Sequence, residues 1–223
     1  MASDPAPSSP SHAPTASRES PGARAARVRR ALSIALGALA LALLLGFAWA
    51  HFAFPSDRTP RGAYLRVVIA VNRGRVQDFF AYTETRAQHA CYTIRDYRKK
   101  TRERVLQSFP EPDRSRLAAE YAEEAAAPDG ANVLAIYAKR NGWMNRLRKD
   151  MSGVAQVEER GERATVQTAH GTRYPFRRRE NGIWGLTLFT ATLSAEAEKS
   201  ARDLALIEKA ANDYEHAAKA EAK

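Results

Sequence analysis

The fold is decided by residues 161–189, which read GERATVQTAHGTRYPFRRRENGIWGLTLF. Apolar and polar side chains alternate along three short runs, and this period of two is typical of strands with one buried face. The turns between them are His170-Gly171 and Asn181-Gly182, and Asn-Gly between alternating runs is a strong hairpin signal. With the run VAQVEE at 154–159 and the turn Arg160-Gly161 before them, they predict a four-stranded antiparallel meander.

The alternation also predicts which side chains of the meander face the core. The expected inward residues are Ala164, Val166, Thr168, Tyr174, Phe176, Trp184, Leu186 and Leu188. Pro175 has no N–H to donate to a neighbouring strand, so we expect its strand to lie at an edge of the sheet or to bend there.

Helical patterns precede the meander. Residues 62–72, GAYLRVVIAVN, are apolar enough for a buried strand or a helix, and we favour a helix that ends near Asn72. A long helical region is expected over 76–108, where Cys91 shares an apolar face with Ala87 and Ile94 and therefore lies in the core. Shorter amphipathic helices are expected after Asp113, which can cap the first of them, from Asp129, which starts the next, and from Trp143, which shares a face with Leu147 and Met151.

A final helix is expected to begin with Ser194 as its cap. Its small and apolar residues are spaced alternately by three and four, at Ala197, Ser200, Leu204, Ile207, Ala211, Tyr214 and Ala218. This seam fits either a weak coiled coil between copies or packing on the chain's own domain. We favour the second, because short helices usually take their stability from tertiary contacts.

The segment 31–54 is apolar throughout except for Ser33 and His51. It holds the roughly 20 residues needed to cross a bilayer, so we expect a retained transmembrane helix. Cleavage after Ala50 is the alternative, because Ala48-Trp49-Ala50 fits a signal-peptidase site. Arginines crowd the N-terminal flank, which by the positive-inside rule places the N-terminus in the cytoplasm and the rest outside it.

These patterns divide the chain into five parts. We expect a disordered basic cytoplasmic tail (1–30), the transmembrane helix (31–54), a linker (55–61), an exported α+β domain (62–193) and a C-terminal helix (194–223). The fold class is α+β, with an N-terminal transmembrane helix, a helical region, an antiparallel β-meander and a C-terminal helix. The predicted location is a bacterial inner membrane, with the C-terminal domain in the periplasm.

The order of these elements resembles the nuclear-transport-factor-2-like (cone) superfamily. The resembling pieces are GAYLRVVIAVNRGR, GERATVQTA and RRRENGIWGLTLF. Bacterial members, among them the VirB8-like secretion components, often carry a cytoplasmic tail, one membrane helix and a periplasmic cone. The chain departs from that pattern in a large helical insertion at 110–151 and in its extra C-terminal helix, so no site residues are carried over.

Basic residues form the candidate docking site. The chain has a net charge of +10, and its clusters include Arg98, Lys99, Lys100, Arg173, Arg177, Arg178 and Arg179. One interpretation is a solvated face close to anionic headgroups. The sharper one is a surface that docks phospholipid, an acidic wall polymer or an acidic protein through planar guanidinium groups. No nucleic acid is expected as a partner of an exported domain.

Residues for metal, cofactor or nucleophilic chemistry do not stand out. The five histidines form no ligand pair at useful spacing, and nucleotide-binding and G-x-S-x-G motifs are missing from the sequence. The single cysteine, Cys91, allows no intrachain disulfide. We therefore expect no metal and no cofactor.

Three functions remain open from the sequence. We expect a membrane-anchored binding or assembly module without catalysis, with membrane lipid and either a protein or a second copy of the chain as partners. A tethered enzyme is the first alternative, with a pocket formed by Asp96, Tyr97, His170 and Trp184. A spacer that self-associates through its last helix is the second.

Overall fold

The computed structural model describes residue 32 and residues 35–47 and 54–221. The chain falls into two units, Met1–Ala53 and Phe54–Lys223. In the first unit the described residues are helical and their leucines are exposed. Within the described ranges, no helix is long and apolar enough to span a bilayer. The tail predicted at 1–30 lies outside the described residues, as does part of the span predicted at 31–54.

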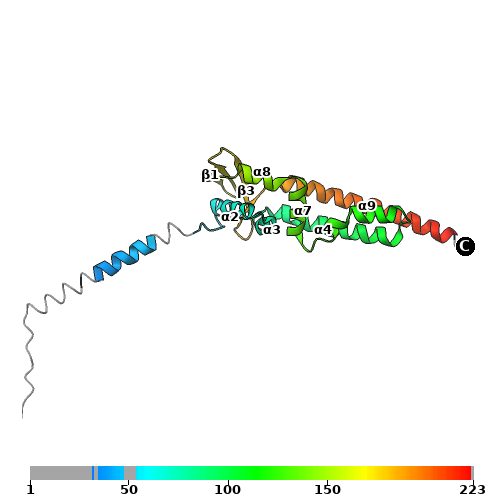
Figure 1. Ribbon diagram of the computed structural model, residues 1–223, viewed down its shortest axis with the longest axis horizontal. Coiled ribbons are helices and arrows are strands. Elements are labelled where there is room, and N and C mark those ends of the chain that lie inside the picture. The colour runs from blue at the N-terminus through cyan, green and yellow to red at the C-terminus, as the bar shows by residue number, and fades with distance from the viewer. Residues whose placement is uncertain (1–31, 33–34, 48–53, 222–223) are drawn as a thin grey trace, which may run out of the picture. The chain divides into compact units, whose positions relative to one another are not determined.

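The second unit begins with helices, as Figure 1 shows. Helix α2 (Pro60–Asn72) starts after Thr59, whose hydroxyl accepts the N–H of Gly62, and Pro60 occupies a position where its missing N–H has no cost. The helix expected over 62–72 is confirmed. The later helical elements are α3 (Val76–Phe79), η1 (Phe80–Tyr82), α4 (Thr85–Ser108), α5 (Asp113–Glu120), α6 (Ala122–Ala125), α7 (Gly130–Arg140) and α8 (Trp143–Asp150).

One antiparallel sheet follows, with its strands in chain order: β1 (Val154–Arg160), β2 (Arg163–Thr168), β3 (Arg173–Arg178) and β4 (Trp184–Leu186). Its turns contain Gly161, Gly171 and Gly182, all with positive φ, a region that glycine enters without a steric penalty. The predicted meander and the α+β class are confirmed. Helix α2 packs against the sheet, and Tyr64 lies 5.5 Å from Tyr174 between ring centroids.

The expected inward side chains of the sheet are buried except for Leu188, which is 46% exposed. Strand β4 ends at Leu186. The N–H of Thr187 still bonds to the carbonyl of Pro175 at 3.0 Å, but Pro175 has no N–H to return the bond, so the ladder and its alternation stop before Leu188. Pro175 lies in the internal strand β3 and not at an edge. Its missing N–H falls just beyond the β3–β4 pairing, which begins at Phe176.

The long helix expected over 76–108 is interrupted before α4. The N–H of Glu84 bonds to the carbonyl of Leu186 at 3.1 Å, and Thr83 forms an isolated parallel bridge with Leu186. These bonds take two residues out of the helix and join them to the end of β4. Within α4, Cys91 is fully buried in the main core, as its spacing from Ala87 and Ile94 predicts.

Helix α9 (Thr190–Glu221) begins four residues before Ser194, so Ser194 is not its cap. It runs alongside α4, and Figure 1 shows the pair extending together away from the sheet. The seam is buried against the chain's own domain at Ala197, Ser200, Leu204, Ile207 and Ala211. Ile207 and Ala211 form a second core cluster with Val105 and Phe109.

The predicted caps of the shorter helices had mixed outcomes. Asp129 caps α7, because its carboxylate accepts the N–H of Asn132 at 2.9 Å. Asp113 is not the cap of α5: Pro112 holds that position, and the Asp113 carboxylate pairs with Arg116 at 3.0 Å. Trp143 and Leu147 of α8 are buried, as their spacing predicts.

Candidate anion-docking site

Three consecutive arginines at the end of β3 meet the beginning of α4. Between them lies an open cleft of about 610 Å³, which we call the arginine cleft. Its lining residues are Glu84, Thr85, Arg86, His89, Arg177, Arg178, Arg179, Glu180 and Asn181. The bonds from residues 83 and 84 to Leu186 bring the two elements together, since they fix the start of α4 beside β4.

A buried carboxylate anchors this cleft. The Glu84 side chain is only 9% exposed, and it accepts a hydrogen bond from the Thr190 hydroxyl at 2.7 Å. Its other oxygen faces Arg177, whose Nη1 lies 3.1 Å away. The partly buried carboxylate therefore has both of its oxygens bonded, which its low exposure requires.

Arg179 has a structural role at the base of the cleft. Its guanidinium donates to the Ala81 carbonyl at 2.6 Å, to the Gln88 side chain at 3.1 Å and to the Thr85 hydroxyl at 3.3 Å. Burial lowers the pKa of Arg179 from its ordinary value, although an arginine stays charged under physiological conditions. It thus adds a fixed positive charge whose donors are largely occupied by the protein.

Arg86, Arg178 and His89 provide the accessible part of the site. All three side chains are exposed, and the one carboxylate near Arg178 in the described part of the chain is that of Glu162, at 4.0 Å. Arg86 and His89 have no hydrogen-bonding or ionic partner among the residues that the structure describes. The backbone N–H groups at the start of α4 add a positive partial charge beside them. Planar guanidinium groups in this setting suit a phosphate or carboxylate ligand.

The predicted docking residues do not all belong to this cleft. Arg177, Arg178 and Arg179 do, whereas Arg98 is buried and its Nη1 lies 2.6 Å from Asp203. Lys99 and Lys100 are exposed, but thirteen or more residues of helix separate them from Arg86, about 20 Å along α4. The structure therefore divides the sequence-based cluster into an exposed site, an internal ion pair and two solvated lysines.

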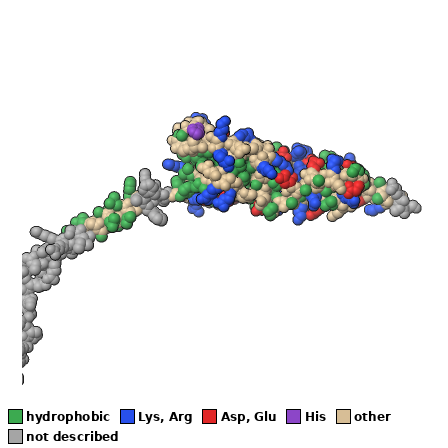
Figure 2. Space-filling model, viewed as in Figure 1, with side chains coloured by type: hydrophobic (Ala, Val, Ile, Leu, Met, Phe, Trp, Pro, Cys, Tyr) green, Lys and Arg blue, Asp and Glu red, His purple; other side chains and the backbone are tan. Residues whose placement is uncertain are grey.

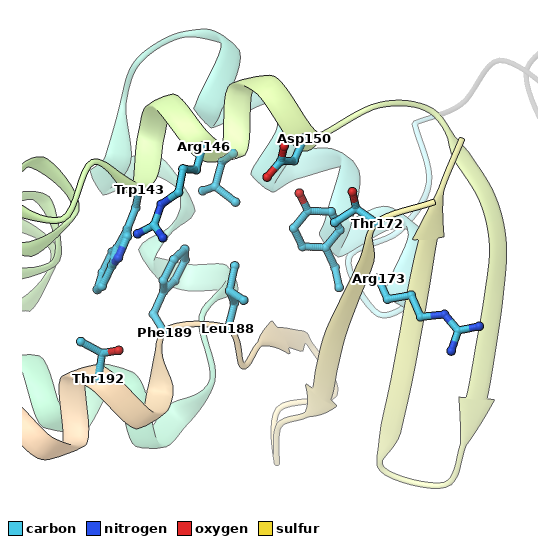
Figure 3. A pocket seen from close by; sticks show the side chains of 10 residues that line it. Trp143, Arg146, Asp150, Thr172, Arg173, Leu188, Phe189 and Thr192 are labelled. Carbon is cyan, nitrogen blue, oxygen red and sulfur yellow. The ribbon is translucent and has the colours of Figure 1, made fainter. Parts of the chain in front are cut away.

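Arg173 lies beside a different pocket, shown in Figure 3. This pocket of about 320 Å³ is lined by Trp143, Arg146, Leu147, Asp150, Thr172, Arg173, Tyr174, Leu188, Phe189 and Thr192. Arg146 reaches in beside Trp143 and Phe189, which stack at 4.4 Å, while the guanidinium of Arg173 points away from them. Burial and the nearby Tyr64 and Asp150 raise the pKa of Tyr174 to about 12.

The residues considered for an enzymatic pocket lie in different places. Asp96 pairs with Arg95 at 2.7 Å on the surface of α4, and His170 is exposed in the β2–β3 turn. Trp184 is buried and donates its indole N–H to the carbonyl of Arg58 at 3.1 Å. In the described part of the chain, no group of three or more His, Cys, Asp or Glu side chains could hold a metal ion.

Sequence reasoning missed Glu84, Thr85, Arg86 and His89. These residues lie about ninety positions before the three arginines, and the folded chain brings them together through the bridge to β4 and through direct bonds from Arg177 to Glu84 and from Arg179 to Thr85. Comparisons with protein-family models, curated proteins and solved structures find no match to the chain. The geometry and charge of the arginine cleft are therefore the basis for inferring function.

Proposed function

We propose that the chain is a single-pass membrane protein whose second unit is an exported binding or assembly module. The arginine cleft carries this proposal, because it combines exposed Arg86 and Arg178 with charges held in place by Glu84 and Thr85. Arg177 and Arg179 are held in place by the protein, so the cleft keeps a positive charge on which Arg86 and Arg178 can close around an anionic group. The docked ligand presents phosphate or carboxylate groups.

The membrane part of the proposal is supported by sequence. The run Ala31–Ala50 has the length of a bilayer span, and Arg24, Arg27, Arg29 and Arg30 precede it. By the positive-inside rule these arginines stay in the cytoplasm, and the second unit is exported to the periplasm of a bacterial cell.

We also propose that the second unit is a cone-like domain. Its support is the order of elements, helices before an antiparallel meander, and the packing of α2 against the sheet. The helices at 113–150 and α9 are additions to that plan. An experimental structure that lacked a concave sheet around α2 would contradict the cone assignment.

Topology is tested by cysteine labelling of the full chain. Cys91 is buried, so a single exposed cysteine, Glu103→Cys on α4, reports where the second unit lies. A membrane-impermeant maleimide should label this variant in cells whose inner membrane is intact. Labelling only after lysis would overturn export, and a mature chain beginning at His51 would overturn the retained helix.

Docking is tested with a soluble polyanion, long-chain polyphosphate, and the full chain in neutral detergent. Replacing both exposed cleft arginines, Arg86→Glu with Arg178→Glu, should weaken binding at least about tenfold. The matched control, Lys99→Glu with Lys100→Glu, makes the same change in net charge about 20 Å away along α4. Equal weakening by the two pairs would show that only net charge matters and would overturn the cleft as a site.

A further inference from the structure

Among the described residues of the second unit, the net positive charge comes from one end. The segments that build the sheet end, 54–84 and 143–189, hold 14 Lys and Arg against 8 Asp and Glu. The segments of the helical end, 85–142 and 190–221, hold 15 of each. In Figure 2 red and blue side chains mix along the helical end, whereas the charged side chains visible at the sheet end are mainly blue. The sheet end therefore presents a positive field to whatever it faces.

The lead-in segment, residues 54–59, is bound to this same end. The N–H of Trp184 donates to the carbonyl of Asp57 at 3.3 Å, and its indole N–H donates to that of Arg58 at 3.1 Å. Arg66 of α2 lies over the Phe54 ring, 5.0 Å from its centroid. This segment, most of which belongs to the linker predicted at 55–61, is attached to β4 and α2, which fixes where the chain enters the unit.

That point of attachment adjoins the arginine cleft. The Arg58 side chain lies about 4.0 Å from the position that a Cβ on Gly182 would occupy, and Asn181 beside it lines the cleft. On the other side, Tyr82 donates to the Asp57 carboxylate at 3.5 Å, and the preceding Ala81 accepts from Arg179. The cleft and the lead-in segment are therefore parts of one continuous surface.

On the proposed membrane span, the length of the connecting chain limits the distance between this surface and the bilayer. Phe54 is four residues beyond Ala50, a separation of at most about 14 Å for a fully extended chain. The Phe54 side chain is 46% exposed and lies under a guanidinium group, a combination suited to the headgroup region. With the span proposed at Ala31–Ala50, the length of this connection limits how far the point where the chain enters the second unit can lie from the bilayer.

We infer that the ligand of the arginine cleft is the phosphate of anionic phospholipid headgroups in the membrane that anchors the chain. This inference rests on the proposed function and names its ligand. The sheet end docks on the bilayer, and α4 and α9 then carry their distal ends away from it. The four arginines of the cleft supply the charge: Arg86, Arg177, Arg178 and Arg179. The guanidinium N–H groups of Arg86 and Arg178 are exposed and can donate to a headgroup.

The test uses the full chain in nanodiscs, with a fluorophore on an introduced cysteine and a nitroxide quencher on the lipid headgroups. Glu180→Cys reports from the cleft, and Glu103→Cys is its matched control on the distal part of α4. Discs contain either phosphatidylcholine alone or a mixture with phosphatidylglycerol. We expect quenching at position 180 to exceed that at 103 severalfold in the anionic discs, and to fall with added salt. Equal quenching at both positions, or no dependence on phosphatidylglycerol, would overturn the inference.

Two further arms identify the source of the phosphate. The pair Arg86→Glu with Arg178→Glu should abolish the lipid-dependent quenching, whereas Lys99→Glu with Lys100→Glu should leave it. Inorganic phosphate at matched ionic strength should not release the labelled cleft from the disc; release would assign the cleft to a free anion and overturn the lipid inference. If the unaltered chain binds polyphosphate but does not dock on anionic discs, only this inference is refuted. If the unaltered chain does neither, the proposed function is refuted as well.

Discussion

Arg98 and Asp203 form an ion pair between α4 and α9, with Nη1 of the arginine 2.6 Å from Oδ2 of the aspartate. Their side chains are 7% and 24% exposed, and the Arg98 guanidinium also lies 5.0 Å from the centroid of the Tyr121 ring. The two residues are separated by 105 positions in sequence, so the pair helps to define how the two longest helices of the second unit align.

Replacing one member of this pair should destabilise the second unit strongly. Asp203→Asn leaves a buried guanidinium without its counter-charge, which costs about 3–5 kcal/mol. The measurement is urea unfolding of the full chain in neutral detergent, followed by tryptophan fluorescence. As a control, Asp113→Asn breaks the exposed pair with Arg116 and should leave the unfolding midpoint nearly unchanged. Equal midpoints for the two variants would show that the Arg98 pair is not effectively buried.

Cys91 should resist alkylation in the folded chain. Burial raises the pKa of its thiol from 9.0 to about 12, so the reactive thiolate is scarce and the sulfur is inaccessible. Iodoacetamide at pH 8 should modify Cys91 only after unfolding, as mass spectrometry would show. Rapid modification of the folded chain would contradict its place in the core.

The same raised pKa makes stability depend on pH. Between pH 9 and 12 the folded thiol keeps a proton that the unfolded thiol loses, so stability from this group is present below pH 9 and is lost as pH rises. The contribution to the slope is up to about 1.4 kcal/mol per pH unit. The slope for Cys91→Ala, measured by urea unfolding across this range, should be shallower than that of the unaltered chain. Identical slopes would contradict the shift.

Much of the sheet could be predicted because its signals are local. Asn181-Gly182 and the alternation around Val166 and Phe176 depend on neighbouring residues only, and the structure confirms them. The end of β4 could not be predicted, because the alternation continues to Leu188 in the sequence. Pro175 on the neighbouring strand accepts the Thr187 N–H but has no N–H to return, so the ladder ends there for a reason that lies outside β4.

Only part of the candidate site could be predicted from sequence, for a related reason. Arg177, Arg178 and Arg179 are consecutive, so their cluster is evident from sequence, but Arg86 and His89 join them through the distant contact with Leu186. From sequence, Arg98 was predicted to be exposed, because it lies in a basic cluster with Lys99 and Lys100. It is buried because a carboxylate on the final helix lies opposite it, a pairing that local charge patterns do not reveal.

Gly185 should tolerate no side chain. A Cβ at this position would lie 2.7 Å from the carbonyl oxygen of Thr83 and 2.8 Å from backbone atoms of Glu84, which cannot rotate away. Gly185→Ala would therefore separate β4 from the segment before α4, and overpacking of this kind costs about 1–3 kcal/mol. Gly153→Ala is the matched control, since a Cβ there meets no atom within 4 Å. Urea unfolding should give a lower midpoint for Gly185→Ala than for Gly153→Ala. Gly185→Ala should also bind polyphosphate more weakly, because it moves the start of α4 that lines the arginine cleft.

Neighbouring residues on α9 distinguish internal packing from self-association. Ile207 is 9% exposed and packs with Val105 and Phe109, whereas Leu206 is 67% exposed on another side of the helix. Ile207→Ala should cost about 2–5 kcal/mol of unfolding free energy, because it removes buried methyl groups and leaves a cavity. Leu206→Ala should change stability by less than about 0.5 kcal/mol.

Light scattering of both variants in detergent completes this test. If the seam packs only within the chain, stability falls for Ile207→Ala and the molar mass stays constant with concentration for both. A seam that joined two copies would instead give the unaltered chain a concentration-dependent mass, reduced by Ile207→Ala. Ile207 and Ala211 already lie against α4, so a contact between copies through this seam would have to displace α4. Such a displacement would expose Val105 to solvent and increase hydrogen exchange along α4.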